Sequence, residues 1–571
     1  MLENWKKNRK LIYNAGYESS REYLSGKRVK RKTPSILFLL APYMLPFAPI
    51  EIVSEDVGGI IQSYTFTKSR SSAAGQATIK IAADEKTNRF FGDIIAKKYP
   101  FLNSLWREFG LDLRDIFKPM SYCQIWRDGY HVFSGYITSC TRSVSAWNAT
   151  YTITAEELGG ILQGQILSYS TILFGIQQHI INDPTKVLTA ASRQIMMPLS
   201  MSLNAYINAY NASTLSYGTK GYLRMSDGLP LSFRLIAQAP PLGAISNTSI
   251  IAKQTVSYSM FETSAGQTFW EYLRGLCPDP FMELFTESGG RTIVTGRLVG
   301  GNAVPQNILG GINISGINIT PMLPGFNYIV ARTTPYDIPY IGTTSWVSIL
   351  YPITLGMLDL LLGGDFIVIT DADIVDKNLG VSMNQQYTAF TCEYTANKSS
   401  SPNQARTRPS IARGSLNPFY SGGIRTYGYK EYRAMLNCLS LFDIGITGQT
   451  LEKVNQTMWI SAFSTLLNYW FRNASKFNEG TVTVRGMPYA RPGMYCLYLP
   501  LYDGQKVDNW RDIGIYYIDT VQDNYSIGAA DTTTLTLIRG VPLPIKGANI
   551  MRLLFDWEIL PPSPNITDAE V

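Results

Sequence analysis

Hydrophobic and polar residues alternate along four segments near the C-terminus of the chain. β-Branched residues and tyrosines fill these segments, and Gly, Pro, Asn and Asp separate them. Alternation with a period of two places every second side chain on the same face of a strand, so one face is buried and the other meets solvent. The pattern therefore predicts an antiparallel β-meander. Its four strands are expected at 480–486, 492–499, 515–521 and 532–540.

A related pattern occupies the first third of the chain. Its clearest element is a hairpin in which Asp128-Gly129 supplies the positive φ angles of a type I′ turn. The passage from Tyr136-Ile137 to the strand 151–154 parallels the passage from Tyr517-Ile518 to the strand 533–536. This repetition predicts two related β-barrels that arose by internal duplication. Strands of the first barrel are expected at 64–67, 77–81, 122–127, 131–137 and 150–154.

Helices and loops lie between these β regions. The segment 266–277 predicts an amphipathic helix that ends before Pro278. Its buried face would carry Phe269, Trp270, Leu273 and Leu276. Gly289-Gly290 then predicts a hairpin turn between strands at 281–286 and 291–295. Two further helices are expected at 88–117 and 450–472, an exposed loop at 396–424, and no assignable element in 165–260.

The apolar segment 35–45 superficially imitates the core of a secretion signal. It begins after 34 residues, however, and contains Pro42. A helix that spans a bilayer needs about 20 apolar residues, so this segment is too short. We therefore expect a buried strand here and no stable membrane insertion.

Composition indicates a protein whose surface is covered by other subunits. At 571 residues the chain exceeds one hydrophobic core, so three or four domains are expected. Charged residues make up only 16% of the chain, whereas about a quarter is usual for soluble proteins. The chain holds 35 Tyr and 10 Trp, residue types that are enriched in subunit interfaces.

The net charge of +7 resides in a basic N-terminal arm. Residues 1–32 hold ten Lys or Arg and three Glu, and the remaining 40 basic and 40 acidic residues cancel. Basic termini are commonly solubilising tails. Here docking of the arm in a groove of a neighbouring subunit is the leading hypothesis, and contact with nucleic acid is the second. The candidate docking residues are Trp5, Lys6, Lys7, Lys27, Arg28, Lys30, Arg31 and Lys32.

The residues that carry catalysis or bind metals are sparse. Six cysteines lack paired spacing, so they predict buried thiols rather than disulfides or a zinc site. The chain has only two histidines, His131 and His179, which disfavours a His-assisted nucleophile. The usual hydrolase, metalloprotease, P-loop and dinucleotide-binding motifs are absent from the sequence. We expect no enzyme activity, no cofactor, and no catalytic or metal-binding residues.

Four segments, taken in order, resemble baseplate hub proteins of tailed bacteriophages. Those hubs form the late-control-D-like family, which is related to the base of the type VI secretion spike. The segments are TFWEYLRGLCPDPFMELFTESGGRTIV from Thr268, ITDADIVDKNLGVSMNQQYTAFTCEY from Ile369, LNYWFRNASKFNEGTVTVRGMPYARPGMYCLYLP from Leu467, and IYYIDTVQDNYSIGAADTTTLTLIRG from Ile515. The resemblance spans roughly 48–160 and 260–545, whereas 1–47, 165–260 and 396–424 have no recognised counterpart.

The resemblance implies a mainly β (α+β) protein with two tail-tube-like antiparallel β-barrel domains and helical and mixed insertions. It implies a homotrimeric hub in the virion tail that joins the sixfold tail tube to the threefold spike. The tube and spike proteins would be partners, as would the tape measure and baseplate wedge proteins. DNA would pass through the central channel without specific binding, and assembly would take place in the host cytoplasm. The expected domains are 1–47, the arm and first strand; 48–163, the first barrel; 164–260, an insertion; 261–395, a mixed α/β hub domain; 396–449, a loop and connector; and 450–571, a helix and the second barrel.

Two other classes of function remain open at the level of sequence. One is a tail-associated peptidoglycan hydrolase. The other is the spike base of a secretion system or of a phage-tail-like particle. A gene neighbourhood with capsid and terminase genes would favour a virion component over a secretion system.

Overall fold

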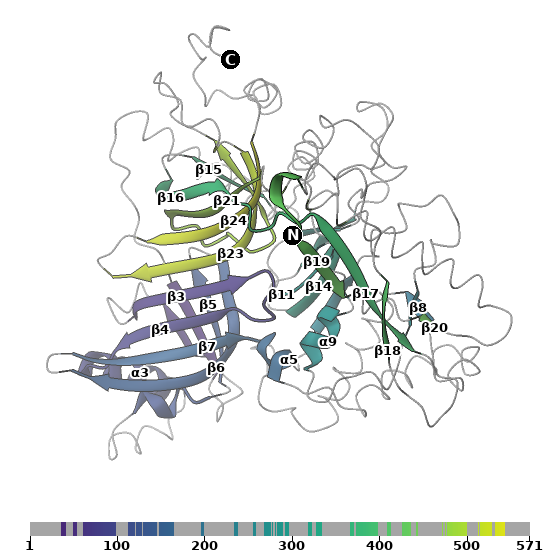
Figure 1. Cartoon of the computed structure of the whole chain (residues 1–571). Helices are drawn as coiled ribbons and strands as arrows, with labels where there is room; N and C mark the ends of the chain where they lie inside the picture. Colours follow the sequence, from purple (N-terminus) through teal and green to yellow (C-terminus); the bar gives the residue numbers. More distant parts are fainter. Residues whose placement is uncertain are drawn as a thin grey trace, which may run out of the picture.

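The computed structural model describes about two fifths of the chain, and most of that part is β-strand (Figure 1). No helix within the described segments is long and apolar enough to cross a membrane. The described residues are 36–41, 50–53, 61–98, 112–119, 121–127, 130–145, 148–164, 196–198, 233–237, 255–257, 268–275, 277, 280, 282–288, 292–295, 318–322, 327–333, 366–370, 373–397, 408–412, 425–435, 441–442, 467, 471, 474, 477–499, 512, 514–527 and 531–542.

One large sheet of 13 strands dominates the molecule. Its strand order is β16-β21-β24-β23-β3-β4-β7-β6-β5-β1-β2, with β22 beside β23 and β15 beside β22. The first half-sheet consists of β1 (Ile36–Ala41), β2 (Ile50–Val53), β3 (Ile61–Ser69), β4 (Gln76–Ala82), β5 (Tyr122–Arg127), β6 (Tyr130–Val144) and β7 (Ala149–Glu157). The second half-sheet consists of β15 (Phe366–Thr370), β16 (Ile374–Val381), β21 (Asn478–Arg485), β22 (Tyr495–Leu499), β23 (Gly514–Ser526) and β24 (Thr532–Pro542).

Alternating side chains build a separate hydrophobic core under each half-sheet. In β7, Tyr151, Ile153 and Ala155 are buried while their neighbours are half exposed, as the period of two requires. They pack with residues of β3 to β6, such as Phe66 and Phe133, in the first core. The second core contains residues of β15 and β21 to β24. The strands predicted at both ends of the chain are thus confirmed.

The neighbour order in the second half-sheet differs from a simple meander. Strands β22, β23 and β24 follow one another antiparallel, but β21 lies beside β24 and not beside β22. The other neighbour of β21 is β16, and β15 pairs with β22, so two strands from 366–381 complete this half-sheet. The antiparallel prediction holds here, and the meander order is wrong because β21 gains a non-local partner on each side.

The described strands do not close into barrels. The sheet runs from β16 at one end to β2 at the other, and no pairing between described strands joins these two ends. The fold is therefore mainly β, as predicted, with two cores along one open sheet. The hairpin around 128–129 fits the pairing of Arg127 with Tyr130, although the two turn residues lie outside the described residues.

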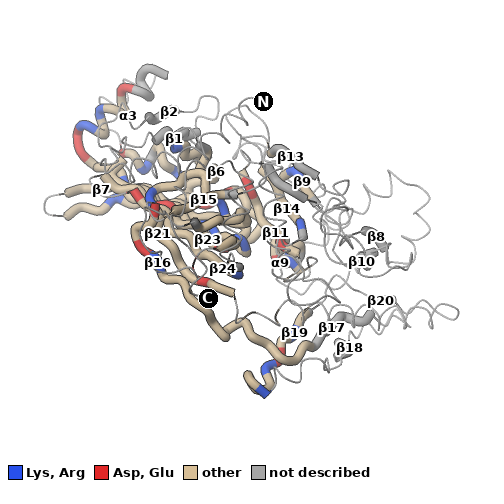
Figure 2. Tube along the Cα trace, turned by 90° about the horizontal axis from the view of Figure 1, so that it is seen from above, with Lys and Arg blue, Asp and Glu red and all other residues tan. Residues whose placement is uncertain are grey.

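Smaller sheets lie on one side of the large sheet in both views (Figures 1 and 2). The hairpin predicted between 281–286 and 291–295 is wrong, because β11 pairs with β14 and β12 pairs with β13. The strands of these sheets are β8 (Met196–Pro198), β9 (Phe233–Ala237), β10 (Thr255–Ser257), β11 (Met282–Glu287), β12 (Thr292–Thr295), β13 (Asn318–Pro321), β14 (Asn327–Thr333), β17 (Ala389–Asn397), β18 (Arg408–Ala412), β19 (Glu431–Met435) and β20 (Leu441–Phe442). Strand β18 occupies part of the segment predicted to be a loop.

The helices are short. Helix α9 (Phe269–Gly275) confirms the predicted helix and starts with a capping box. In that box the Thr268 N–H donates to Glu271 Oε2 at 2.9 Å, and the Glu271 N–H donates to Thr268 Oγ1 at 3.2 Å. The others are α3 (Glu85–Lys98), which begins three residues before the helical insertion predicted at 88–117 and overlaps its first part, a 3-10 turn η2 (Leu113–Asp115), and α5 (Gly160–Gly164). Most of the helix predicted at 450–472 lies outside the described residues, where Leu467 and Phe471 alone are assigned as helical and buried.

Candidate functional site

The two half-sheets meet along one antiparallel strand pair, which we call the seam. It runs from Thr520 opposite Ser69 to Ser526 opposite Ser63, between β23 and β3. Strand β23 serves two partners along the same edge, because its first residues pair with β22 and its last residues pair with β3. Strand β24 covers its other edge. The seam makes one continuous sheet of two halves that are distant in sequence.

A buried polar cluster, the seam cluster, crosses this junction. Arg127 of β5 donates from Nη1 to both Asp523 oxygens of β23, at 2.8 and 2.9 Å. Tyr64 of β3 donates to the same carboxylate at 2.5 Å, and Thr533 of β24 donates to it at 2.9 Å. The second Arg127 nitrogen pairs with Asp531. Side chains from three strands therefore converge on one carboxylate of a fourth strand, and the four strands come from both half-sheets.

Burial makes the seam cluster electrostatically strong. Arg127 is 1% exposed and Asp523 is 2% exposed, so neither charge is compensated by water. Burial opposes the charge of Arg127, but Asp523 and Tyr64 outweigh it and raise the pKa of the guanidinium. Burial, followed by the charge of Asp523, raises the pKa of Tyr64 well above its ordinary value. The cluster has a structural role, because breaking its Arg127–Asp523 pair would leave an uncompensated buried charge.

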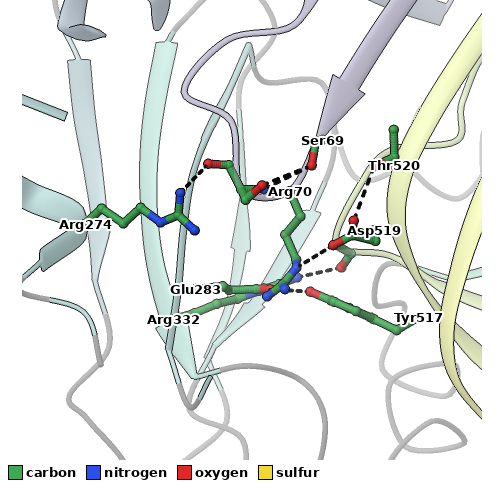
Figure 3. A network of polar contacts seen from close by, with 10 residues as sticks. Ser69, Arg70, Arg274, Glu283, Arg332, Tyr517, Asp519 and Thr520 are labelled. Atoms are coloured by element: carbon green, nitrogen blue, oxygen red, sulfur yellow. Dashed lines mark hydrogen bonds and ion pairs between the residues drawn. The ribbon is translucent and has the colours of Figure 1, made fainter. Parts of the chain in front are cut away.

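A second polar network, the clamp, ties β11 and β14 to the seam (Figure 3). At its centre, Glu283 of β11 accepts from Arg332 Nε of β14 at 2.5 Å. It also accepts from the Tyr517 hydroxyl of β23, and Arg70 Nη1 lies 3.5 Å from its Oε2. Arg332 is fully buried and donates from Nη2 to the Gly493 carbonyl at 2.6 Å. Both carboxylate oxygens of Glu283 are thus occupied by groups from three separate strands.

Arg70 carries the clamp from the end of β3 to β23. Its Nε lies 3.3 Å from Asp519 Oδ1, and its backbone N–H donates to the Asp519 carbonyl at 2.8 Å. Burial disfavours the charge of Glu283, but Arg332 and then Arg70 outweigh burial and lower the pKa of this carboxyl. A cavity of about 430 Å³ lies beside the clamp and is lined in part by Arg70, Arg274 and Glu283. Since Arg70 and Glu283 already bind each other, we regard this arrangement as a structural joint.

The two half-sheets have the same strand order. In the first half it is β3-β4-β7-β6-β5-β1, and in the second it is β16-β21-β24-β23-β22-β15. One pairing differs in direction, since β1 runs antiparallel to β5 whereas β15 runs parallel to β22. Each strand of the second half therefore has a counterpart in the first, where β2 alone has none among the described strands, and the duplication predicted from sequence is present at the level of topology.

The registers of the two half-sheets agree at several matching positions. Tyr122-Cys123 in β5 and Tyr495-Cys496 in β22 are counterparts, because Tyr122 lies opposite Tyr136 and Tyr495 lies opposite Tyr517. The register shift after Ile61 in β3 recurs after Ile374 in β16. The shift after Ile137 in β6 recurs after Ile518 in β23. β-Bulges at matching places indicate two copies of one motif, because a bulge is a specific feature of a fold.

The residues singled out from sequence contribute little to the seam and clamp. The candidate docking residues Trp5, Lys6, Lys7, Lys27, Arg28, Lys30, Arg31 and Lys32 all lie outside the described residues, as does His179. His131 is a buried residue of β6, and burial lowers its pKa to about 3. Cys123 and Cys496 are buried free thiols whose pKa burial raises. Within the described part of the chain, no group of three or more His, Cys, Asp or Glu residues could hold a metal ion.

No protein-family model and no curated protein matches the sequence. Solved structures similar to the chain include the 43 kDa tail protein of prophage MuSo2 from Shewanella oneidensis, with 10% identity and a TM-score of 0.39 over 90% of this chain and 100% of that one. A tail protein from Neisseria meningitidis MC58 is 9% identical, with a TM-score of 0.38 over 89% and 97%. The E. coli c3393 protein, a component of the type VI secretion system, is 7% identical, with a TM-score of 0.30 over 84% and 73%. The first two of these neighbours are tail proteins, and the third is a component of the type VI secretion system.

Proposed function

We propose that the protein is a structural component of a phage tail baseplate and assembles as a trimeric central hub. The observation that carries the proposal is the pair of half-sheets with identical strand order within one chain. A chain with two copies of one motif contributes two similar units to any ring that it forms. Three chains then contribute six units, so such a ring can meet a sixfold partner on one side and a threefold partner on the other.

In this proposal the half-sheets are tail-tube-like modules, which correspond to the expected domains 48–163 and 450–571 with the addition of β1, β15 and β16. The tail tube would bind one face of the ring and the spike the other, with tape measure and wedge proteins as further partners. The low content of charged residues, 16% of the chain, supports wide subunit contacts. Seam and clamp would hold the two modules of each chain at a fixed angle.

The proposed role is mechanical and not catalytic. The buried carboxylates of the seam cluster and the clamp, Asp523 and Glu283, are each bound by an arginine and a tyrosine. Such groups stabilise a joint. Outside the basic arm the charges of the chain balance, which suits a channel through which DNA slides without being held.

Sedimentation and imaging of the purified protein test the hub proposal. We expect a species with three times the chain mass of 63.7 kDa, alone or with the spike protein. Electron microscopy of that species should reveal threefold symmetry with six similar lobes around a channel. A monomer under both conditions would contradict the proposal. Clearing of murein in a gel by the purified protein would instead support the hydrolase alternative.

A further inference from the structure

Among the described strands of the large sheet, open edges occur on β2 and β15, which lie at its ends, and on two further strands, β6 and β16. Strand β6 pairs with β5 only through 130–136, so from Thr138 onward β7 is its only neighbour among the described strands. Strand β16 ends the sheet, and β21 is its only neighbour in the described structure. Open edges carry unpaired backbone N–H and C=O groups and invite pairing with another strand.

Apolar side chains gather on these same two edges. The described residues include six exposed large hydrophobic side chains, and four of them lie on β6, on β16 or directly after β16. They are Val144 at 69% exposed, Val375 at 56%, Val381 at 65% and Met383 at 58%. Exposure of this kind costs solubility in a free monomer, so both edges have the character of an interface.

The seam identifies the partner of each edge. The open part of β6 is the counterpart of the part of β23 that pairs with β3, and β16 is the counterpart of β3. Within one chain the seam thus joins a β6-type edge to a β3-type edge. The seam uses the β6-type edge of β23 and the β3-type edge of β3. The open edge of β6 is the second β6-type edge of the chain, and the open edge of β16 is its second β3-type edge. These two open edges lie in different half-sheets of the same chain.

We propose that β6 of one copy pairs antiparallel with β16 of the next copy, in the register of the seam. Transfer of that register places Ser139 opposite Ser382, Ser143 opposite Asn378, and Ser145 opposite Asp376. Contacts between unlike edges are head-to-tail and close into a ring when the rotation permits. The inference rests on the proposed hub function for the number of copies, three, and on the seam for the edges and the register.

The side chains on the core-facing side fit this pairing. Cys140 packs at the margin of the first core and would lie opposite Val381, while Leu379 packs at the margin of the second core. Val144 and Arg142 are the other residues of β6 on the core-facing side of the proposed strand pair. In the seam the counterparts of these residues are buried, for example Val521 at 1% and Phe66 at 1% exposed. Pairing would therefore cover the margins of both cores.

The charges make the new contact distinct from the seam. The counterpart of Asp523 is Arg142, and the counterpart of Tyr64 is Lys377. Lys377 is already neutralised by Asp512 at 2.9 Å, and the Arg142 guanidinium lies over the Tyr151 ring at 5.9 Å from its centroid. Because Arg142 cannot replace Asp523 beside Arg127, the edge of β6 cannot take the place of β23 in the seam, and this specifies which edges meet.

Disulfide trapping tests the register. Residues opposite each other in an antiparallel pair lie close enough for a disulfide, whereas residues displaced by four positions do not. The first variant is Val381→Cys, which would face the native Cys140 of the next copy. The second is Ser143→Cys with Asn378→Cys in a Cys140→Ser background. The two designs lie three residues apart on β6, so one tests a hydrogen-bonded pair and the other a non-hydrogen-bonded pair. The control is Ser139→Cys with Asn378→Cys in the same background, which is displaced by four positions.

After mild oxidation we expect most of each designed variant to migrate as covalent dimer and trimer in a denaturing gel, with the control at the background level. Sedimentation of the reduced proteins separates this inference from the hub proposal. A trimer without cross-links at either designed pair, or with cross-links in the control, would overturn the strand pairing and leave the hub. Covalent species larger than trimers would support the pairing and refute the threefold hub. A persistent monomer without cross-links would refute both.

Discussion

Thr138 and Asp519 occupy the same bulge position in the two half-sheets. Each is the residue left without a cross-strand partner, after Ile137 in β6 and after Ile518 in β23. At the seam the Asp519 carboxylate reaches Arg70 at 3.3 Å, whereas the exposed Thr138 hydroxyl donates to the Thr154 carbonyl at 3.1 Å. Bulges redirect side chains. The same bulge therefore directs Asp519 into an ion pair at the seam in the second half-sheet, whereas in the first half-sheet it leaves Thr138 exposed at the open edge of β6.

Loss of Arg127 should destabilise the chain strongly. The variant Arg127→Met leaves the Asp523 carboxylate buried with only the Tyr64 and Thr533 hydroxyls to bind it. Removal of one partner of a buried ion pair costs about 3–5 kcal/mol. Urea unfolding followed by tyrosine and tryptophan fluorescence measures the change. The double variant Arg127→Met with Asp523→Leu should recover part of the loss.

The matched control for this change is Arg433→Met, because Arg433 is exposed and its ion pair with Glu431 spans 3.6 Å. We expect the control to leave the unfolding midpoint unchanged. If Arg127→Met behaves like this control, the seam cluster does not hold the half-sheets together.

Gly486 should not tolerate a methyl group. A Cβ at this position would lie 2.5 Å from Asp531 Oδ2 and nearer still to Arg127 Nη2. Both atoms are fixed by their mutual ion pair, so Gly486→Ala must displace the seam cluster. We expect a loss of about 1–3 kcal/mol, as for other overpacked sites. The control Gly92→Ala adds a methyl group with nothing within 4 Å in α3, and it should be neutral or stabilising by up to about 1 kcal/mol.

The basic arm should act on a neighbouring component and not on the trimer. Residues 1–32 carry the whole net charge of +7, and aromatic residues such as Trp5 and Tyr13 could anchor while Lys and Arg set the register. We expect deletion of 2–32 to preserve the sedimentation of the trimer and to impair attachment to a neighbouring tail component in a reconstitution assay. If the arm instead binds DNA, the intact protein should retard DNA at low salt and release it steeply as salt rises. Normal assembly of infectious particles without the arm would exclude both roles.

Local patterns predicted individual strands well, because burial of alternate residues depends on the sequence of the strand itself. Tyr151, Ile153 and Ala155 illustrate this, since their period of two was enough to place β7. The repetition of Tyr136-Ile137 at Tyr517-Ile518 likewise pointed to a duplication, and both pairs precede a bulge in the same register. Side-chain alternation thus carried both the elements and their repetition.

Partners that are distant in sequence were beyond local patterns. Arg127 and Asp523 are 396 residues apart, so no spacing brings them together. The turn residues Gly289-Gly290 favoured a local hairpin, but β11 pairs with β14 and Glu283 pairs there with Arg332. A local turn signal was outweighed by tertiary pairing and by a buried carboxylate that needed an arginine.

His131 should make the stability of the protein depend on pH. Burial, followed by the charge of Arg491, lowers its pKa from 6.5 to about 3, whereas Glu287 acts in the opposite direction. Between pH 6.5 and about 3, the imidazole of the unfolded state is protonated and that of the folded state is neutral. The free energy of unfolding therefore has its full value above about pH 6.5 and decreases as the pH falls toward 3. From pH 7.5 to pH 5 this amounts to a loss of about 2 kcal/mol.

The variant His131→Phe keeps an aromatic ring against Trp126, whose ring centroid lies 4.9 Å from that of His131, and it removes the titrating group. Urea midpoints measured between pH 7.5 and 5 should fall less for the variant than for the natural protein. His179→Gln is the control, and it should retain the natural slope because one titrating imidazole is sufficient to produce it. Equal slopes for the natural protein and His131→Phe would mean that His131 is protonated in the folded state, which is incompatible with its burial in β6 beside Arg491.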